Sequence, residues 1–243
     1  MTRALHRDDL RADVLEGAAT PIARHGYHGM SMRDLAKATG KSLASFYHLF
    51  ESKEEILFEL QSQAFERLIS TAERALVEVH DPVGQLQIFV LNHVRYFAEQ
   101  PDVMRVLVHE AAALPKSHRA LIRALKQRYF EIARDIVRAL VTPDRGVDGL
   151  ELERITYSVF GMLNWIYGWY EPARHGPPEQ LARTIQHLAL HGIDARGAAP
   201  PASDRDAGAP GPTDAGWDTV VSALDGIQRL PLLRGSAETG GSR

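Results

Sequence analysis

Five basic side chains lie between residues 24 and 53 of a chain whose formal net charge is −3. Only two acidic residues share this stretch with them. The basic residues are Arg24, Arg33, Lys37, Lys41 and Lys53. A local basic patch on an acidic body indicates contact with a polyanion, although a solvated helical surface would have the same composition. The chemistry that these residues offer is the binding of phosphate groups.

Two short helical patterns, separated by a glycine, carry this basic patch. Ser31 can cap the first helix, with Asp34 at the capping-box position, and Gly40 ends it. The second helix is predicted over residues 42–49. Two short helices joined by a tight turn have the layout of a helix-turn-helix. The small residues at the start of the second helix would let its backbone lie deep in a DNA major groove.

The stretch GYHGMSMRDLAKATGKSLASFYHLFESKEEIL, which begins at Gly26, resembles the N-terminal signature of tetracycline-repressor (TetR/AcrR) family regulators. The resemblance implies an all-helical homodimer whose N-terminal domains bind a palindromic operator, and most of that family represses transcription. It places eight residues at DNA-contacting positions. These are Ser31, Arg33, Ser42, Leu43, Ala44, Ser45, Tyr47 and Lys53.

Helical periodicity continues along the chain to about residue 193, so we predict an all-α fold. We expect a DNA-binding domain over residues 1–52, with its helix-turn-helix at about 31–50, and an effector-binding and dimerisation domain over 53–193. Pro21 lies inside the first helical pattern and predicts a kink or an early break there.

Composition changes at Asp194, because 15 of the 23 residues from there to Gly216 are Ala, Gly or Pro. We therefore expect a disordered tail over 194–243, with a possible short helix at 217–230.

Apolar and aromatic side chains among the middle helices predict a cavity for a hydrophobic ligand, although each of them alone suits plain core packing equally well. Two of the candidates, His93 and Asn164, would be polar groups that orient the ligand. The remaining wall candidates are Phe89, Tyr96, Phe97, Met104, Leu107, Val108 and Tyr129.

The run FGMLNWIYGWY, which begins at Phe160, contains almost no polar residue and predicts helical packing against a partner subunit. The expected dimer residues are Gly161, Met162, Trp165, Trp169 and Leu188. The segment GMLNWIYGWYEP, followed by PPEQLARTIQHLALHGI, resembles the C-terminal ends of TetR relatives that sense fatty acyl-CoA or steroid-derived CoA thioesters. This resemblance implies an acyl-CoA as the small hydrophobic effector.

Several classes of function are disfavoured by what the sequence contains. The chain has no cysteine, so thiol catalysis and thiolate metal sites are excluded. We find no phosphate-binding glycine loop, nucleophile elbow or complete metal-ligand set, and we expect no enzyme, no cofactor and no metal. The absence of a long apolar run leads us to expect a cytoplasmic protein without a membrane partner. Two alternatives stay open, an efflux-pump regulator that senses aromatic drugs and a helical protein-interaction adaptor.

Overall fold

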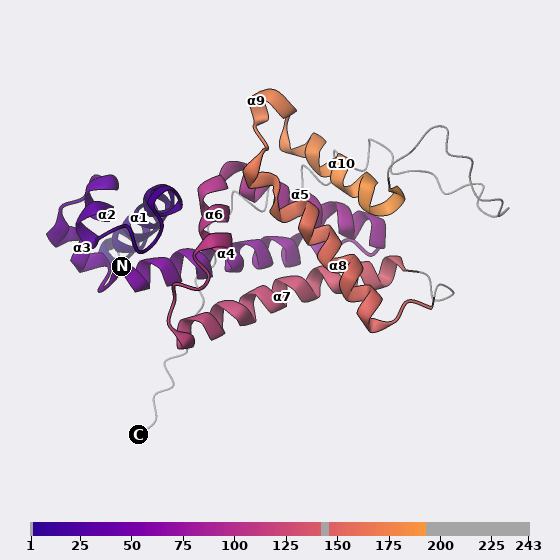
Figure 1. The fold of residues 1–243 in the computed structure, drawn as a ribbon, viewed down its shortest axis with the longest axis horizontal. Helices are drawn as coiled ribbons and strands as arrows, with labels where there is room; N and C mark the ends of the chain where they lie inside the picture. The colour runs from indigo at the N-terminus through magenta and orange to yellow at the C-terminus, as the bar shows by residue number, and fades with distance from the viewer. Residues whose placement is uncertain (1, 142–145, 193–243) are drawn as a thin grey trace, which may run out of the picture.

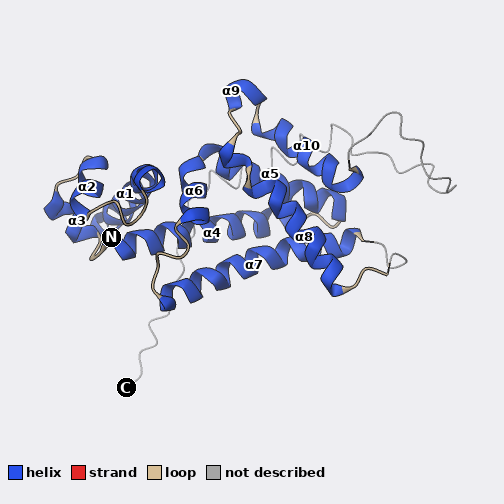
Figure 2. Cartoon of the chain, in the orientation of Figure 1, coloured by secondary structure: helices blue, strands red, loops and turns tan. Residues whose placement is uncertain are grey.

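The computed structural model describes residues 2–141 and 146–192. Within these ranges the chain forms helices joined by turns, with no strand (Figure 2), which confirms the predicted all-α fold. None of the helices in the described part is long and apolar enough to cross a lipid bilayer. The predicted tail over 194–243, including the short helix at 217–230, lies outside the described residues.

The helices follow one another in a simple order along the chain (Figure 1). They are α1 (Thr2–His25), α2 (Met32–Ala38), α3 (Leu43–Leu49), α4 (Lys53–Leu76), α5 (Pro82–Glu99), α6 (Pro101–His109), α7 (Lys116–Leu140), α8 (Gly149–Asn164), the 3-10 helix η2 (Ile166–Gly168), α9 (Pro172–His175) and α10 (Pro178–His191).

The N-terminal unit consists of α1, α2 and α3, gathered around the first turns of α4 at one end of the molecule (Figure 1). Side chains from all of these helices form one buried apolar cluster. Its members include Val14, Ile22, Leu35, Phe46, Leu49, Phe50, Ile56 and Leu57. Leu35, Phe46 and Leu49 therefore hold the helix pair to its neighbours, and the opposite faces of α2 and α3 remain at the surface.

Helix α1 is continuous through Pro21, so the prediction of an early break there is wrong. A proline removes one backbone hydrogen bond and crowds the carbonyl four residues earlier. The burial of apolar side chains on the same helix offsets the lost hydrogen bond, because Val14, Ala18 and Ile22 are fully buried. The helix ends instead at Gly26, whose φ of +73° is a conformation that glycine adopts without strain.

The larger unit is built on three long helices, α4, α5 and α7, which pack against one another. Arg128 on α7 binds both carboxylate oxygens of Glu73 on α4, at 2.8 and 2.9 Å. Helix α10 lies along α5, where Arg95 pairs with Glu179 at 2.7 Å. Helix α8 covers α5 and α7 from the outside.

The aromatic run after Phe160 is not one helix, which corrects the prediction made from its composition. Helix α8 ends at Asn164, and the chain continues through the 3-10 turn of η2. Ile166 is buried beneath this turn, whereas the side chains of Trp165 and Trp169 are 63% and 42% exposed. The two exposed tryptophans thus flank this turn.

Candidate DNA interface and effector cavity

Helix α2 begins at a complete capping box, which fixes the approach of the chain to the helix-turn-helix. The Ser31 hydroxyl oxygen accepts a hydrogen bond from the Asp34 backbone N–H at 3.2 Å. The Asp34 carboxylate accepts from the Ser31 backbone N–H at 2.9 Å and from its hydroxyl at 2.6 Å. Hydrogen bonds from Ser31 lower the pKa of Asp34, so this carboxylate stays charged at the N-terminus of the helix, where the helix dipole favours it.

The turn between α2 and α3 uses Gly40, whose φ is +69°. Thr39 closes α2 by donating its hydroxyl to the Leu35 carbonyl at 2.9 Å. Ser42 then caps α3, because its hydroxyl accepts from the Ser45 backbone N–H at 3.1 Å. The hydroxyls of Ser42 and Ser45 lie 2.8 Å apart. These short-range bonds set the relative orientation of the two helices.

Six of the eight residues predicted to contact DNA are exposed on α2, α3 and their caps. They are Ser31, Arg33, Ser42, Ala44, Ser45 and Tyr47. Leu43 is only partly exposed and packs against the core. The structure thus brings small side chains, one arginine and one phenol to a single exposed helix pair, a combination that suits contact with base edges and phosphates.

Lys53, the eighth residue, is partly buried at the first turn of α4. Its Nζ donates to the carbonyl oxygens of Tyr27 and Met30, at 2.8 Å each, and lies 4.2 Å from the centre of the Tyr27 ring. An ammonium group has three N–H donors, so these two bonds leave one for a phosphate. Lys53 therefore ties the turn between α1 and α2 to the start of α4.

Arg11 is a residue of this unit that the sequence did not single out. Its guanidinium binds the Leu49 carbonyl oxygen and the carboxylates of Glu55 and Glu59, and it lies 4.4 Å from the centre of the Phe50 ring. It thus joins α1, the end of α3 and α4. Its partners are about 40 residues away in the chain, so no local pattern could have indicated them.

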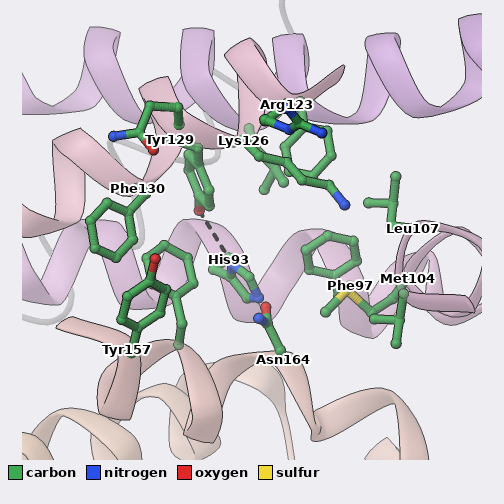
Figure 3. A pocket seen from close by; sticks show the side chains of 15 residues that line it. His93, Phe97, Met104, Leu107, Arg123, Lys126, Tyr129, Phe130, Tyr157 and Asn164 are labelled. Carbon is green, nitrogen blue, oxygen red and sulfur yellow. Dashed lines mark hydrogen bonds between the residues drawn. The ribbon is translucent and has the colours of Figure 1, made fainter. Parts of the chain in front are cut away.

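A cavity of about 340 Å³ lies among α4, α5, α6, α7 and α8 (Figure 3). Seven of the nine residues predicted to form a pocket line it. They are His93, Phe97, Met104, Leu107, Val108, Tyr129 and Asn164. Phe89 does not line the cavity; it is fully buried behind the wall, with its ring 4.9 Å from that of Tyr129. Tyr96 instead lines a separate cleft between α1, α4, α5 and α6.

The sequence missed the contribution of α4 and of the polar face of α7 to this cavity. The additional lining residues include Phe65 and Leu68 on α4, Arg123, Lys126 and Gln127 on α7, and Tyr157 on α8. Arg123 and Lys126 are three positions apart on an amphipathic helix, where they have the appearance of ordinary solvent-facing residues. Arg123 and Lys126 line the cavity only because α7 packs against α4 and α5.

Arg123 and Lys126 give the cavity its charge, because none of the described residues that line it is Asp or Glu. Within the described residues neither of the two forms an ion pair. Lys126 is partly buried, and its Nζ lies 5.7 Å from the centre of the Phe65 ring. Burial lowers the pKa of Lys126, since it disfavours the charged ammonium, and a bound anion would relieve this penalty.

His93 and Tyr129 are the deeply buried polar side chains of the cavity wall, each with 2% of its surface exposed. The Nδ1 atom of His93 lies 3.3 Å from the Tyr129 hydroxyl. Burial lowers the pKa of His93 to about 3, and the Leu163 carbonyl offsets this only in part. Burial also raises the pKa of the Tyr129 phenol. Both groups are therefore neutral near pH 7, and this part of the wall offers hydrogen bonds, whereas the charge comes from Arg123 and Lys126.

The predicted dimer residues lie on α8, next to η2 and on α10. Gly161 and Trp165 are exposed on and just after α8, and Met162 and Leu188 are partly exposed. A Cβ atom added at Gly161 would meet no other atom of the chain within 4 Å. Tyr157, one turn earlier on α8, is 62% exposed and extends this aromatic surface.

Comparison with known proteins agrees with this architecture. The model for bacterial regulatory proteins of the tetR family matches residues 14–60, and that for the tetracyclin repressor-like C-terminal domain matches residues 79–193. The transcriptional repressor AcnR of Corynebacterium efficiens is 41% identical over 70 residues, which cover 28% of this chain and 37% of AcnR. The chain therefore spans well under two thirds of the length of this relative.

Solved structures match over a greater length. The TetR-family regulator PfmR from Thermus thermophilus is 36% identical, with a TM-score of 0.65, over 74% of this chain and 98% of PfmR. AibR, solved in complex with isovaleryl coenzyme A and operator DNA, is 25% identical, with a TM-score of 0.61, over 73% of this chain and 96% of AibR. Because relatives with the same helix-turn-helix and the same helical second domain match along most of its length, the chain belongs to the TetR family of transcriptional regulators and not to a family of enzymes.

Proposed function

We propose that this protein is a cytoplasmic, homodimeric repressor that leaves a palindromic operator when a small hydrophobic effector with an anionic group binds in its cavity. An acyl-CoA thioester is the first candidate effector. The observation that carries this proposal is the cavity among α4 to α8, which has aromatic walls, two cationic side chains and no carboxylate.

The DNA part of the proposal rests on the exposed face of α2 and α3. Ser45 and Ala44 would face the bases, where Ala44 can contact a thymine methyl group and the Ser45 hydroxyl can bond either a donor or an acceptor. Ser31, Arg33, Ser42, Tyr47 and Lys53 would hold the phosphates and set the register of the helix in the groove. Leu43, which is half-buried, would contribute an apolar contact next to Ala44.

The dimer part rests on the exposed aromatic surface of α8 and η2. Large exposed apolar side chains that gather on one face mark interaction sites, and here they include Tyr157, Trp165 and Trp169. Gly161 would allow the partner's helix to approach closely. Pairing would place the two reading helices on successive major grooves, about 34 to 36 Å apart on B-DNA.

The effector part rests on charge and on the AibR complex. Arg123 is exposed and Lys126 is partly buried, so both can meet the phosphates of a CoA moiety while aromatic side chains hold the acyl group. AibR, which shares the fold, is known with isovaleryl coenzyme A bound. A cationic aromatic drug would meet two positive charges and no carboxylate in this cavity, which disfavours the efflux-type alternative.

Two helices offer a physical route from the cavity to the DNA interface. Helix α4 carries Lys53 at its first residue and Phe65 and Leu68 on the cavity wall. Helix α6 carries Met104 and Leu107 on the same wall and packs against α1. An effector that displaces these helices would change the distance between the two α3 helices of the proposed dimer. By linkage, operator DNA must weaken effector binding by the same factor.

The test measures release of fluorescent DNA, taken from the region upstream of the protein's own gene, by fluorescence anisotropy. Octanoyl-CoA, octanoate and the cationic drug ethidium are added in turn, and we expect octanoyl-CoA to release DNA at the lowest concentration. The Arg123→Gln and Lys126→Gln variants should each need roughly tenfold more octanoyl-CoA, the loss expected for a charge-assisted bond.

Arg119→Gln provides the matched control, because Arg119 is exposed on α7 but does not line the cavity. Release by ethidium alone would replace the acyl-CoA proposal with the efflux-type alternative. A failure of all three compounds to release DNA would refute the proposed class of effector.

A further inference from the structure

One ring nitrogen of His93 has no hydrogen-bond partner among the described residues, although it is buried in the cavity wall. The Nδ1 atom meets the Tyr129 hydroxyl, but the Nε2 atom meets none. The Leu163 carbonyl contacts the His93 ring and raises its pKa, but this contact lacks the distance and angle of a full hydrogen bond to Nε2. Buried polar groups are nearly always hydrogen-bonded, because leaving one unpaired costs the free energy of removing it from water. An exception inside a ligand cavity indicates that the missing partner belongs to the ligand.

The neighbours of His93 determine which nitrogen carries the proton. Asn92 lowers the pKa of the Tyr129 phenol, as an amide N–H near its oxygen does, so we assign the phenol proton to the contact with Nδ1 of His93. The neutral imidazole has a single N–H, which is then at Nε2. His93 therefore carries its unpaired hydrogen-bond donor within the cavity wall, where Nε2 is almost fully buried, and the partner that it lacks is an acceptor.

Asn164 supplies a second polar group at the same place. It is the last residue of α8 and lines the cavity together with His93. In the view of Figure 3, Asn164 projects from α8 toward the His93 side of the cavity, whereas Tyr129 projects from α7. The side chains of His93 and Asn164 form no hydrogen bond with each other among those of the described residues, so the amide N–H of Asn164 is available to the same acceptor.

We infer that the Nε2–H of His93 and the side-chain amide of Asn164 together bind the carbonyl oxygen of an acyl thioester seated in the cavity. This inference rests on the proposed function and specifies which atom of the effector the protein recognises. A carbonyl oxygen has two lone pairs and can accept both bonds at once. Neither donor changes its charge near pH 7, so this recognition is independent of pH there.

The size of the cavity limits the acyl group. A volume of about 340 Å³ holds on the order of ten non-hydrogen atoms, at roughly 30 Å³ each. A complete CoA moiety is much larger and must extend out of the cavity, past Arg123 on α7. An acyl chain of about four to eight carbons, with its carbonyl between His93 and Asn164, fits the volume.

The experiment compares two ligands that differ at one atom. Octanoyl-CoA carries the thioester carbonyl, and S-octyl-CoA has a CH₂ group in its place. Binding of each to the full-length protein is measured by isothermal titration calorimetry, and operator release is measured in parallel. We expect octanoyl-CoA to bind at least tenfold more tightly, because S-octyl-CoA leaves two donors unpaired.

The variant His93→Phe, which keeps an aromatic ring in place, should lose most of the preference, because it removes one of the two donors. Asn164→Leu, at an exposed site that tolerates substitution, should lose part of the preference. His109→Phe is the matched control, since His109 is exposed on α6 and does not line the cavity, and it should keep the full preference. With octanoyl-CoA labelled with ¹³C at its carbonyl, the infrared band of that carbonyl should shift to lower frequency on binding, a readout that needs no variant.

The outcomes separate this inference from the proposed function. Equal binding of the two ligands, with both releasing DNA, would refute the carbonyl contact and leave the hydrophobic effector in place. An undiminished preference in His93→Phe, or an unshifted carbonyl band, would assign the preference to other residues. If neither ligand bound, the acyl-CoA part of the proposed function and this inference would fail together.

Discussion

The Nζ atom of Lys53 lies 2.8 Å from the carbonyl oxygen of Met30, the residue that directly precedes the N-cap of α2. One side chain thus fixes both the loop that leads into the helix-turn-helix and the first turn of α4. We expect Lys53→Ala to lower the free energy of unfolding by about 1 kcal/mol, since it removes hydrogen bonds from a charged but only partly buried donor. Thermal unfolding followed by circular dichroism measures this.

The same variant should also weaken binding to every DNA sequence alike. One lost phosphate contact lowers the slope of log K against log salt by about 0.9. The control is Lys116→Ala, which removes the same charge from an exposed site at the start of α7. An unchanged slope in Lys53→Ala would mean that Lys53 positions the loop but does not contact a phosphate.

Tyr47 and Ser45 are neighbours on the exposed face of α3, and we expect them to act on DNA in different ways. Tyr47→Phe removes a hydroxyl that reaches phosphate, so affinity should fall several-fold on all sequences. Ser45→Ala should change the preferred base at one position of each half-site, because its hydroxyl faces base edges. Selection from a random DNA library, followed by sequencing, distinguishes the two. A shift in base preference in the Tyr47 variant would reverse these assignments.

Trp165 is 63% exposed in the single chain, so a charge at this position should disturb assembly rather than folding. We expect Trp165→Glu to convert the dimer into a folded monomer, because a carboxylate buried without a partner at the interface costs several kcal/mol. Light scattering at micromolar concentration measures the mass, and circular dichroism checks the helix content. Leu121→Glu, an exposed site on α7, should remain dimeric. A monomeric wild-type protein would contradict the proposed interface.

His93 makes stability depend on pH in a defined window. Its pKa is about 3 in the folded chain and about 6.5 in the unfolded chain, so only the unfolded state binds the proton between these values. Stability should be fully present above pH 6.5 and fall by about 1.4 kcal/mol per pH unit as the pH drops toward 3. Urea unfolding of the ligand-free protein between pH 7 and 5 measures this slope, which should be shallower in His93→Phe. An identical slope in that variant would mean that other groups take up the proton.

The helix boundaries around the DNA interface could be predicted from the sequence because the interactions that set them are local. Ser31 and Asp34, or Ser42 and Ser45, are three residues apart and bond to each other in almost any fold that contains the helix. Gly40 likewise ends α2 through its own backbone conformation. The resemblance of this stretch to TetR regulators rests on the same residues.

The cavity could be predicted only in part, because its walls come from helices far apart in the chain. Phe89 and His93 are one turn apart on α5, and periodicity cannot tell which of them faces a cavity and which the core. The prediction of a continuous helix through Trp165 and Trp169 was wrong for the same reason, since hydrophobicity alone does not separate a buried side chain from an exposed one.

The sequence by itself determined that this chain is helical and that it carries a capped helix-turn-helix, because hydrogen bonds within a few residues and the period of the apolar positions encode both. Only the tertiary structure decided that Arg123 and Lys126 line the cavity, that Lys53 binds the loop before α2, and that His93 is neutral with one nitrogen unpaired. Each of these depends on burial and on distances between segments separated by more than 20 residues, and a linear pattern contains neither quantity.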